Sequence, residues 1–355
     1  MLGFFVLVLA VAIGVAGWSI GRGSGSSGEF FARPQQRPQS EQVTDPSAAG
    51  KVAPGIVDIN TELGLQGKQA AGTGIVLTAN GEVLTNNHVV EGATKIVATD
   101  IGNGRTYSAK VVGYDRGEDI AVVQLQGASG LTTAPIGDST KAAVGDAIFG
   151  IGNAGGVGGA PDVAPGRIVA LDQSITASDE SGGSSEQLKG LIQVDANIQA
   201  GDSGGALAND SGEVIGVNTA ASAGYELGRG GRQVGGTQGF AIPINQALDI
   251  AKQIESGKGS ATVHIGETAI LGVTVGDAAD GAGIRDVLSS GPAAEAGITG
   301  GSVITAVDGQ TVDSATALTH VLDQHHPKDT VKVTWTDQLG QEHSADVKLG
   351  TGPVG

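Results

Sequence analysis

One serine lies between glycines in the stretch Gly201-Asp-Ser203-Gly-Gly, where it could act as a nucleophile. The pattern fits two incompatible active-site turns, the G-x-S-x-G elbow of an α/β-hydrolase and the G-D-S-G-G turn of a chymotrypsin-like protease. A serine hydroxyl is a weak nucleophile until a neighbouring base accepts its proton. The residues that could serve Ser203 as base and orienting acid therefore decide between the two.

The positions of the histidines favour the second turn. His88 is the only histidine before residue 264, and the other five lie in or at the border of a separate C-terminal unit. An α/β-hydrolase has its acid and histidine after the serine, whereas a chymotrypsin-like protease has the order His, Asp, Ser. Most isolated histidines are structural, but strand-forming residues flank His88, so we expect it to project from a strand end into a cleft.

The acid is expected at the start of a strand between the histidine and the serine. Asp119 directly precedes the apolar run 120–123, where its carboxylate would be dry and fixed, whereas Asp115 and Glu118 are interpreted as solvated loop charges. The predicted triad is therefore His88, Asp119 and Ser203.

The residues after Ser203 exclude the hydrolase elbow, which must run straight into a helix. Instead Gly-Gly-Ala-Leu, a turn at 209–212 and another apolar run follow. Gly201 would let the N–H groups of residues 201 and 203 converge as an oxyanion hole, and Gly204 and Gly205 would leave space behind the nucleophile.

The predicted elements that must position these residues are short strands. No helical pattern of 10–15 residues lies between them, so parallel βαβ units are excluded. A single helix follows, which Asn245 could cap and Gly257 could end. The expected strands are 56–60, 73–77, 82–85, 95–99, 108–114, 120–125, 147–151, 166–171, 190–195, 205–207 and 213–219.

A smaller unit follows a polar joint at 257–260. It has predicted strands at 270–275 and 303–307 and a helix at about 314–324 that buries Leu318, Val321 and Leu322. The fold class is all-β with minor α, a chymotrypsin-like double β-barrel at 52–257 followed by a small α+β domain at 262–350.

The N-terminal part carries two further expectations. Residues 2–21 have no charged side chain and are long enough to cross a bilayer, so 1–21 is a signal peptide or a membrane anchor of an exported protein. Residues 22–51 are rich in Gly, Ser, Pro and Gln and are expected to form a disordered linker.

Composition excludes several kinds of function. The net charge of −17 argues against a phosphate-binding surface, so nucleic acid is not an expected partner. Because the chain has no cysteine, disulfides, thiolate nucleophiles and Cys-ligated metals are excluded.

With these motifs in order, the chain resembles the HtrA (Deg-type) serine proteases, most closely the actinobacterial secreted PepA-type members. The small C-terminal unit resembles their PDZ domain. The resemblance covers nearly everything from Val52 onward and rests on Gly72-Thr-Gly-Ile-Val, Leu84-Thr-Asn-Asn-His88-Val-Val, Asp119-Ile-Ala-Val, Ile192-Gln-Val-Asp-Ala-Asn, Gly201-Asp-Ser203-Gly-Gly, Val214-Ile-Gly-Val-Asn-Thr, Gly239-Phe-Ala-Ile-Pro, Ile270-Leu-Gly-Val, Gly291-Pro-Ala-Ala-Glu-Ala-Gly-Ile and Val303-Ile-Thr-Ala-Val-Asp-Gly.

The resemblance implies an extracytoplasmic endopeptidase that needs no metal or cofactor and cuts unfolded or damaged proteins. It also implies that C-terminal peptides bind the PDZ domain by strand addition and regulate the protease. The expected peptide-binding residues are Ile270, Leu271, Gly272, Val273, Leu318 and Val321.

The specificity pocket is expected to take small or medium apolar residues. In the trypsin-like scheme the residue six before the nucleophile reads charge, and here it is Asn197, so cleavage after Lys or Arg is not expected. The other expected lining residues are Ile198, Val217, Asn218, Thr219 and Ala220.

Asp202 departs from the Asn of many family members, and we hypothesise an internal partner for it, such as Arg167 or Arg232. The short 60–72 loop argues against large cage-like assemblies and leaves a homotrimer open. The alternative function is a catalytically quiet chaperone or peptide sensor on the same fold, and a lipase or esterase is third.

Overall fold

The structure is a computed structural model that describes residues 46–64, 67–178, 185–219, 226–227 and 238–354. The expected signal or anchor segment 1–21 and most of the expected linker lie outside these residues. Among the residues described, no helix is long and apolar enough to span a membrane.

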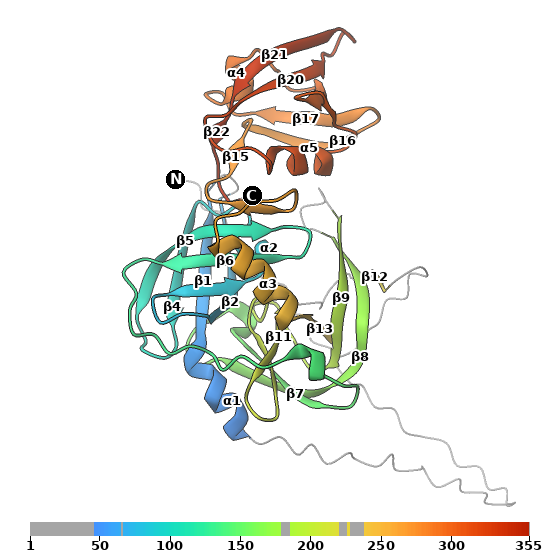
Figure 1. Ribbon diagram of the computed structural model, residues 1–355. Helices are drawn as coiled ribbons and strands as arrows, with labels where there is room; N and C mark the ends of the chain where they lie inside the picture. The colour runs from blue at the N-terminus through green and yellow to red at the C-terminus, as the bar shows by residue number, and fades with distance from the viewer. Residues whose placement is uncertain (1–45, 65–66, 179–184, 220–225, 228–237, 355) are drawn as a thin grey trace, which may run out of the picture. The chain divides into compact units, whose positions relative to one another are not determined.

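Residues 56–125 form a closed antiparallel barrel. Its strands pair in the order β5-β4-β1-β2-β3-β6, and β6 pairs back onto β5, which removes both edges (Figure 1). Val57, Ile59, Val83 and Val123 fill its interior. The elements are β1 Ile56–Leu63, β2 Lys68–Val76, β3 Glu82–Thr85, α2 Asn87–Val90, β4 Lys95–Asp100, β5 Thr106–Asp115 and β6 Ile120–Leu125.

A second barrel repeats this closure with the order β8-β7-β10-β11-β13-β9, where β9 pairs back onto β8. Ile148, Ile168, Val194 and Leu207 form its interior. The elements are β7 Ala147–Gly152, β8 Asp162–Ser178, β9 Ser185–Asp195, β10 Ala206–Asn209, β11 Val214–Thr219, β12 Glu226–Leu227 and β13 Gln238–Pro243. The double barrel expected from the sequence is confirmed, with most strands longer than the patterns suggested.

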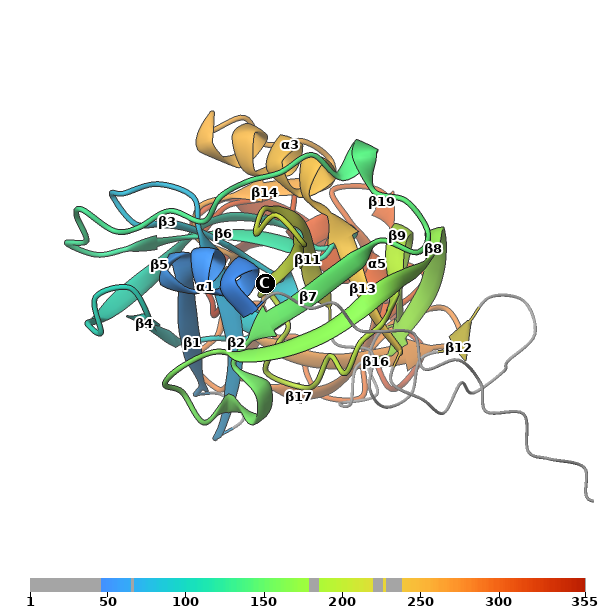
Figure 2. The same ribbon diagram turned by 90° about the horizontal axis from the view of Figure 1, so that it is seen from below.

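One helix joins the two barrels. α3 (Ile244–Glu255) packs against β5 and β6 of the first barrel and β11 of the second (Figure 2). Asn245 does not cap it, because the helix starts at Ile244 and the Asn245 side chain instead bonds the Ser139 N–H and Asp138. Gly257, at φ 68°, follows the helix end as expected.

The expected linker ends in a short helix, α1 (Pro46–Val52), so the prediction of disorder up to residue 51 is wrong for its last six residues. Ala48, Ala49 and Val52 are buried in the core between the barrels, and Lys51 Nζ donates to the Ser211 carbonyl at 3.1 Å. Burial of this apolar stripe, not composition, decides the local structure.

The C-terminal domain contains a six-stranded sheet with β16 at one edge, in the order β16-β17-β18-β20-β21, and β19 pairs with β18 beside this path. Its core contains Ile304, Leu318, Val333 and Trp335. The elements are β15 Ala269–Ile270, β16 Val273–Ala278, β17 Gly281–Val287, α4 Pro292–Glu295, β18 Val303–Val307, β19 Gln310–Thr311, α5 Ala315–Leu322, β20 Thr330–Thr336, β21 Glu342–Lys348 and β22 Gly350–Thr351. Ser314 caps α5 by accepting the Ala317 N–H.

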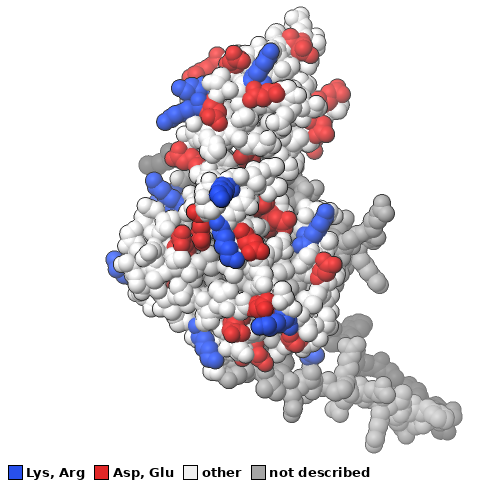
Figure 3. Space-filling model, viewed as in Figure 1, with Lys and Arg blue, Asp and Glu red and all other residues white. Residues whose placement is uncertain are grey.

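The border between the domains differs from the expected one. β14 (Val263–Ile265), placed by the sequence in the C-terminal unit, pairs with β5 of the first barrel. At the other end, Val354 exchanges backbone hydrogen bonds with Gly92 and Ala93, directly after the α2 turn. Acidic and basic side chains are interspersed on the face shown in Figure 3.

Candidate active site

His88 and Asp119 form a directly bonded pair. The Asp119 carboxylate lies 2.9 Å from His88 Nδ1 through Oδ2, and its Oδ1 accepts the His88 backbone N–H at 3.0 Å. The Asp119 side chain is 4% exposed and the His88 side chain 41% exposed. The Asp119 carboxylate is thus shielded from water and bonded through both oxygens, while the His88 imidazole is partly exposed in a cleft.

The two partners are presented by short turns and not by strand ends. His88 lies in α2, a single helical turn that follows β3, so the expectation that it projects from a strand is wrong. Asp119 adopts a left-handed conformation, φ 53°, immediately before β6. The Asn86 side-chain amide donates to the Asp119 carbonyl at 2.9 Å, which ties the acid's turn to the histidine's turn.

The Ser203 turn runs from strand to strand, as expected, and depends on its glycines. Gly201 and Gly204 have φ of 98° and 81°, which side chains rarely adopt. A Cβ atom at Gly204 would lie 2.2 Å from both the Thr73 carbonyl oxygen and Thr85 Oγ1. The Ser203 turn therefore packs tightly against β2 and against the end of β3, which α2 follows.

Ser203 and the histidine turn approach one another across Gly72. A Cβ atom at Gly72 would lie 2.6 Å from a Val89 methyl group and 3.2 Å from the Ser203 carbonyl oxygen. The fold thus brings together three segments that are far apart in sequence and carry His88, Asp119 and Ser203.

The peptide groups that carry the expected oxyanion donors are held by their carbonyl ends. The Gly201 N–H shares its peptide with the Ala200 carbonyl, which accepts the Gly155 N–H at 2.7 Å. The Ser203 N–H shares its peptide with the Asp202 carbonyl, which accepts the Gly205 N–H at 2.9 Å. Because a peptide group is planar, these bonds fix the direction in which each N–H points.

Asp202 has a different partner from the one hypothesised. Its Oδ2 accepts the Gln199 backbone N–H at 2.8 Å, and its Oδ1 has no donor among the described residues. Among the described residues no ion pair joins Asp202 to Arg167, and Arg232 lies outside them. Burial raises the pKa of Asp202 to about 6. The side chain closes a local turn before Ser203.

Other acids near the triad also differ from the sequence interpretation. Asp115 is 3% exposed, accepts the Glu118 N–H at 3.1 Å, and burial raises its pKa. It was expected to be solvated. Glu118, half-buried, accepts a hydrogen bond from Gln246 of α3.

The expected specificity residues are mostly core residues. Ile198 and Val217 are buried in hydrophobic clusters, and the buried Asn218 side chain donates to the Ala206 carbonyl at 3.0 Å. Thr219 is also buried, and Ala220 lies outside the described residues. Of the described members only Asn197 is exposed.

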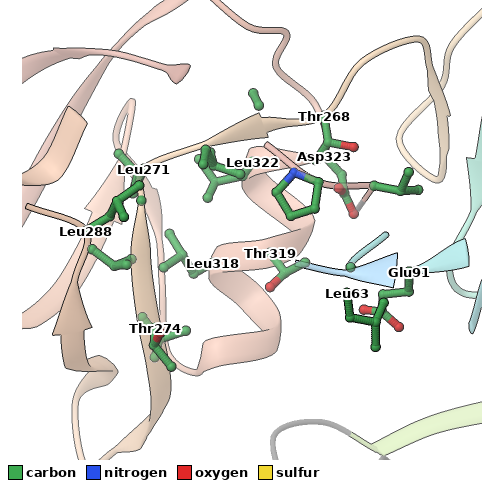
Figure 4. Close-up of a pocket in the computed structure, with 18 of the residues that line it drawn as sticks. Leu63, Glu91, Thr268, Leu271, Thr274, Leu288, Leu318, Thr319, Leu322 and Asp323 are labelled. Carbon is green, nitrogen blue, oxygen red and sulfur yellow. The ribbon is translucent and has the colours of Figure 1, made fainter. Parts of the chain in front are cut away.

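A pocket of about 910 Å³ borders the edge strand of the C-terminal domain (Figure 4). All four expected strand residues line it, and so do Leu318 and Leu322 of α5. Val321, expected on this wall, is not among the lining residues, although it packs in the same core cluster as Leu318. Leu322 follows Leu318 by four residues, so the two side chains share a helix face. The signal for Leu322 was therefore present in the spacing.

The same pocket is lined by residues of the first barrel, including His88 and Arg116. The Arg116 side chain, 9% exposed, forms ion pairs with Glu91 and, at 3.2 Å, with Asp323 at the end of α5. Tyr114 donates to the other oxygen of Asp323 at 2.7 Å. Apart from His88, none of these residues is predicted as functional from the sequence, because no motif marks them.

Comparison with known proteins gives two domain matches. Residues 72–217 match the family model of the trypsin-like peptidase domain, and residues 269–349 match that of the PDZ domain. The expected pairing of a trypsin-like domain with a PDZ domain is confirmed.

The chain is similar to serine protease PepD of Mycobacterium tuberculosis, with 38% identity over 319 residues that cover 85% of this chain and 65% of PepD. It is also similar to periplasmic serine endoprotease DegP of Escherichia coli K12, with 38% identity over 70% of this chain and 50% of DegP. The match therefore spans only about half to two thirds of these relatives' lengths. A solved structure of the HtrA-type protease AlgW with a tripeptide is 28% identical, covers 87% of this chain and 97% of its own, and has a TM-score of 0.48.

Proposed function

We propose that this chain, a trypsin-like peptidase domain joined to a PDZ domain and homologous to HtrA-type serine proteases, is a serine endopeptidase. The observation that carries the proposal is the His88 ring bonded to the buried Asp119 beside the glycine-framed turn of Ser203. This is the arrangement that nucleophilic catalysis by serine needs.

In the proposed reaction His88 accepts the Ser203 proton as the oxygen attacks a peptide carbonyl, and then returns a proton to the leaving amine. Asp119 keeps Nδ1 protonated and stabilises the imidazolium. The N–H groups of Gly201 and Ser203 bind the oxyanion, and loss of one such donor typically costs about 3 to 4 kcal/mol.

A fluorophosphonate probe tests this proposal. We expect labelling of the wild type, no labelling of Ser203→Ala, and unchanged labelling of Ser290→Ala, an exposed serine of the PDZ domain. The labelled protein should cleave unfolded casein in preference to lipid esters. If the wild type remained unlabelled yet suppressed aggregation of unfolded proteins, the chaperone alternative would replace the peptidase.

We further propose that C-terminal peptides add as a strand beside β16 and act on the triad through Arg116. The groove wall α5 is followed directly by Asp323, which Arg116 binds, and the Arg116 carbonyl accepts the Asp119 N–H at 3.1 Å. A peptide that displaces α5 would therefore also move the turn that carries Asp119. Fluorophosphonate labelling with and without an apolar C-terminal peptide, in the wild type and in Asp323→Asn, tests this. A peptide effect of equal size in both proteins would contradict the route.

Location, assembly and specificity complete the proposal. The names of the relatives DegP and DegQ call them periplasmic, which supports an extracytoplasmic location with residues 1–21 as signal or anchor. N-terminal sequencing of the exported protein distinguishes cleavage from anchoring, and sedimentation tests for a homotrimer. A peptide library tests the preference for small or medium apolar residues before the cut.

A further inference from the structure

Thr73 of β2 is a fully buried residue that joins three separate segments of the fold. Its hydroxyl donates to the Gly201 carbonyl at 2.6 Å and accepts the Asn153 N–H at 2.9 Å. Its backbone N–H donates to the Ser203 carbonyl at 2.8 Å. One residue therefore holds the carbonyl groups of both residues whose N–H groups are the proposed oxyanion donors.

The hydroxyl has a fixed polarity in this position. A hydroxyl has one proton and two acceptor lone pairs. The backbone N–H of Asn153 can only donate and the Gly201 carbonyl can only accept, so the Thr73 proton must point at Gly201. The bond fixes the plane of the Gly201–Asp202 peptide, directly after the first donor.

The segment that begins at Asn153 completes the support of that donor. Asn153 Oδ1 accepts the Gly158 N–H at 2.7 Å, and the Gly155 N–H donates to the Ala200 carbonyl, which orients the Gly201 N–H. The far end of the segment is held by the buried Asp58, whose Oδ2 accepts the Gly159 N–H at 3.0 Å. Thr73 thus anchors both the Ser203 turn and the loop that braces it.

Thr73 also contacts the histidine side of the site. Its carbonyl accepts the Thr85 hydroxyl at 2.7 Å, and Thr85 precedes Asn86, which binds the turn of Asp119. The Thr73 bonds therefore set the position of the nucleophile turn relative to the histidine and its acid.

We propose that Thr73 is a positioning residue that aligns the Gly201 and Ser203 donors with the oxyanion that forms at Ser203, through its hydroxyl at the Gly201 carbonyl and its backbone N–H at the Ser203 carbonyl. The inference rests on the proposed peptidase function and adds a residue that does not touch the substrate. Because it acts on groups that are engaged in the transition state, its loss should lower kcat and leave KM unchanged.

The test compares Thr73→Val, which keeps the shape and removes the hydroxyl, with Thr73→Ser, which keeps the hydroxyl. We expect Thr73→Val to lower kcat on casein-derived peptides by at least about tenfold, and by no more than the roughly 10²- to 10³-fold typical of deleting a donor outright. KM should stay within about twofold and Thr73→Ser should restore kcat to within about threefold of wild type. Thr61→Val is the matched control, because Thr61 is buried in the same hairpin and donates to the Ala70 carbonyl away from the site.

The inference is overturned if folded Thr73→Val keeps the wild-type kcat, or if Thr73→Ser loses as much as Thr73→Val. If Thr73→Val does not fold, Thr73→Cys replaces it, because a thiol is a weaker donor. An unchanged kcat in that variant would also overturn the inference. Ser203→Ala in the same assay separates the two proposals: activity in Ser203→Ala refutes the peptidase function, whereas an inactive Ser203→Ala beside a fully active Thr73→Val refutes only the role of Thr73.

Discussion

The substitution Asp119→Asn should inactivate the protein without unfolding it, for a reason that the geometry specifies. Asp119 Oδ1 accepts the His88 backbone N–H at 3.0 Å, and Oδ2 faces Nδ1 at 2.9 Å. An asparagine in this site must place its oxygen against the backbone N–H, because that group only donates. Its NH₂ group then faces Nδ1, which must become an acceptor, so the ring proton moves to Nε2, where the serine proton should be received.

The wrong tautomer removes the base and leaves the binding groups intact. The expected loss in kcat is about 10⁴-fold, or about 5 kcal/mol in the activation free energy. The assay is hydrolysis of unfolded casein at pH 8, with the fluorophosphonate labelling rate as a second measure and circular dichroism as the check of folding.

Asp115→Asn is the matched control for this substitution. Asp115 is buried as deeply as Asp119 and lies four residues earlier in the same turn region, but its carboxylate accepts the Glu118 N–H, whereas the imidazole is bonded to Asp119. Its kcat should stay within about threefold of wild type, as for a buried hydrogen bond outside the reacting groups. Folded Asp119→Asn with more than about a tenth of the wild-type kcat, or an equal loss in Asp115→Asn, would refute the tautomer argument.

Three further substitutions test other parts of the molecule. Leu322→Lys introduces a charge into the groove wall at a half-buried position and should abolish binding of apolar C-terminal peptides, measured by calorimetry, while casein cleavage without peptide persists; retained affinity would show that the peptide binds elsewhere. Asp202→Asn should raise the free energy of unfolding at pH 7.5 by at most about 3 kcal/mol, because burial raises the pKa of Asp202 from 3.8 to about 6. Above about pH 6 the folded protein must bury the charged carboxylate, which destabilises it relative to the asparagine variant. In urea titrations the stability difference between Asp202→Asn and the wild type should shrink as the pH falls from 6 to 4. A difference that does not change with pH would show that the buried charge is not its cause. Gly204→Ala should cost at least about 3 kcal/mol in unfolding free energy, because its Cβ would meet two oxygens at 2.2 Å, whereas Gly50→Ala, with open space around it, should not destabilise; similar values for both would refute the packing at the turn.

The sequence was informative wherever the signal is local. Strand patterns, the position of the one available histidine, and the strand after Ser203 predicted the double barrel and the residues that meet at the candidate site. The four-residue spacing of Leu318 and Leu322 also indicates a shared helix face, although Val321 is the residue predicted for the groove wall. These features depend on a few neighbouring residues, so a period or a motif is enough to reveal them.

Features that depend on burial by a distant segment could not be predicted in this way. The stripe of Ala48, Ala49 and Val52 is only one turn long and stands at the end of a polar segment, so composition favours disorder. Its helix forms because the core between the barrels covers it. Nothing near residue 50 in the sequence specifies that cover.

The same argument explains why the charges around the acid were misjudged. The stretch Asp115 to Asp119 contains four charged residues in five, which is typical of an exposed loop. In the structure Asp115 and Arg116 are buried, because β14 pairs with the end of β5 and Asp323 of the PDZ domain meets the guanidinium. A buried charge is stable only when a partner compensates it, so the burial of Arg116 marks the place where the second domain contacts the turn of Asp119. Because this loop carries the proposed catalytic acid and also binds the end of the helix beside the proposed peptide groove, a change at one of these sites should also change the other.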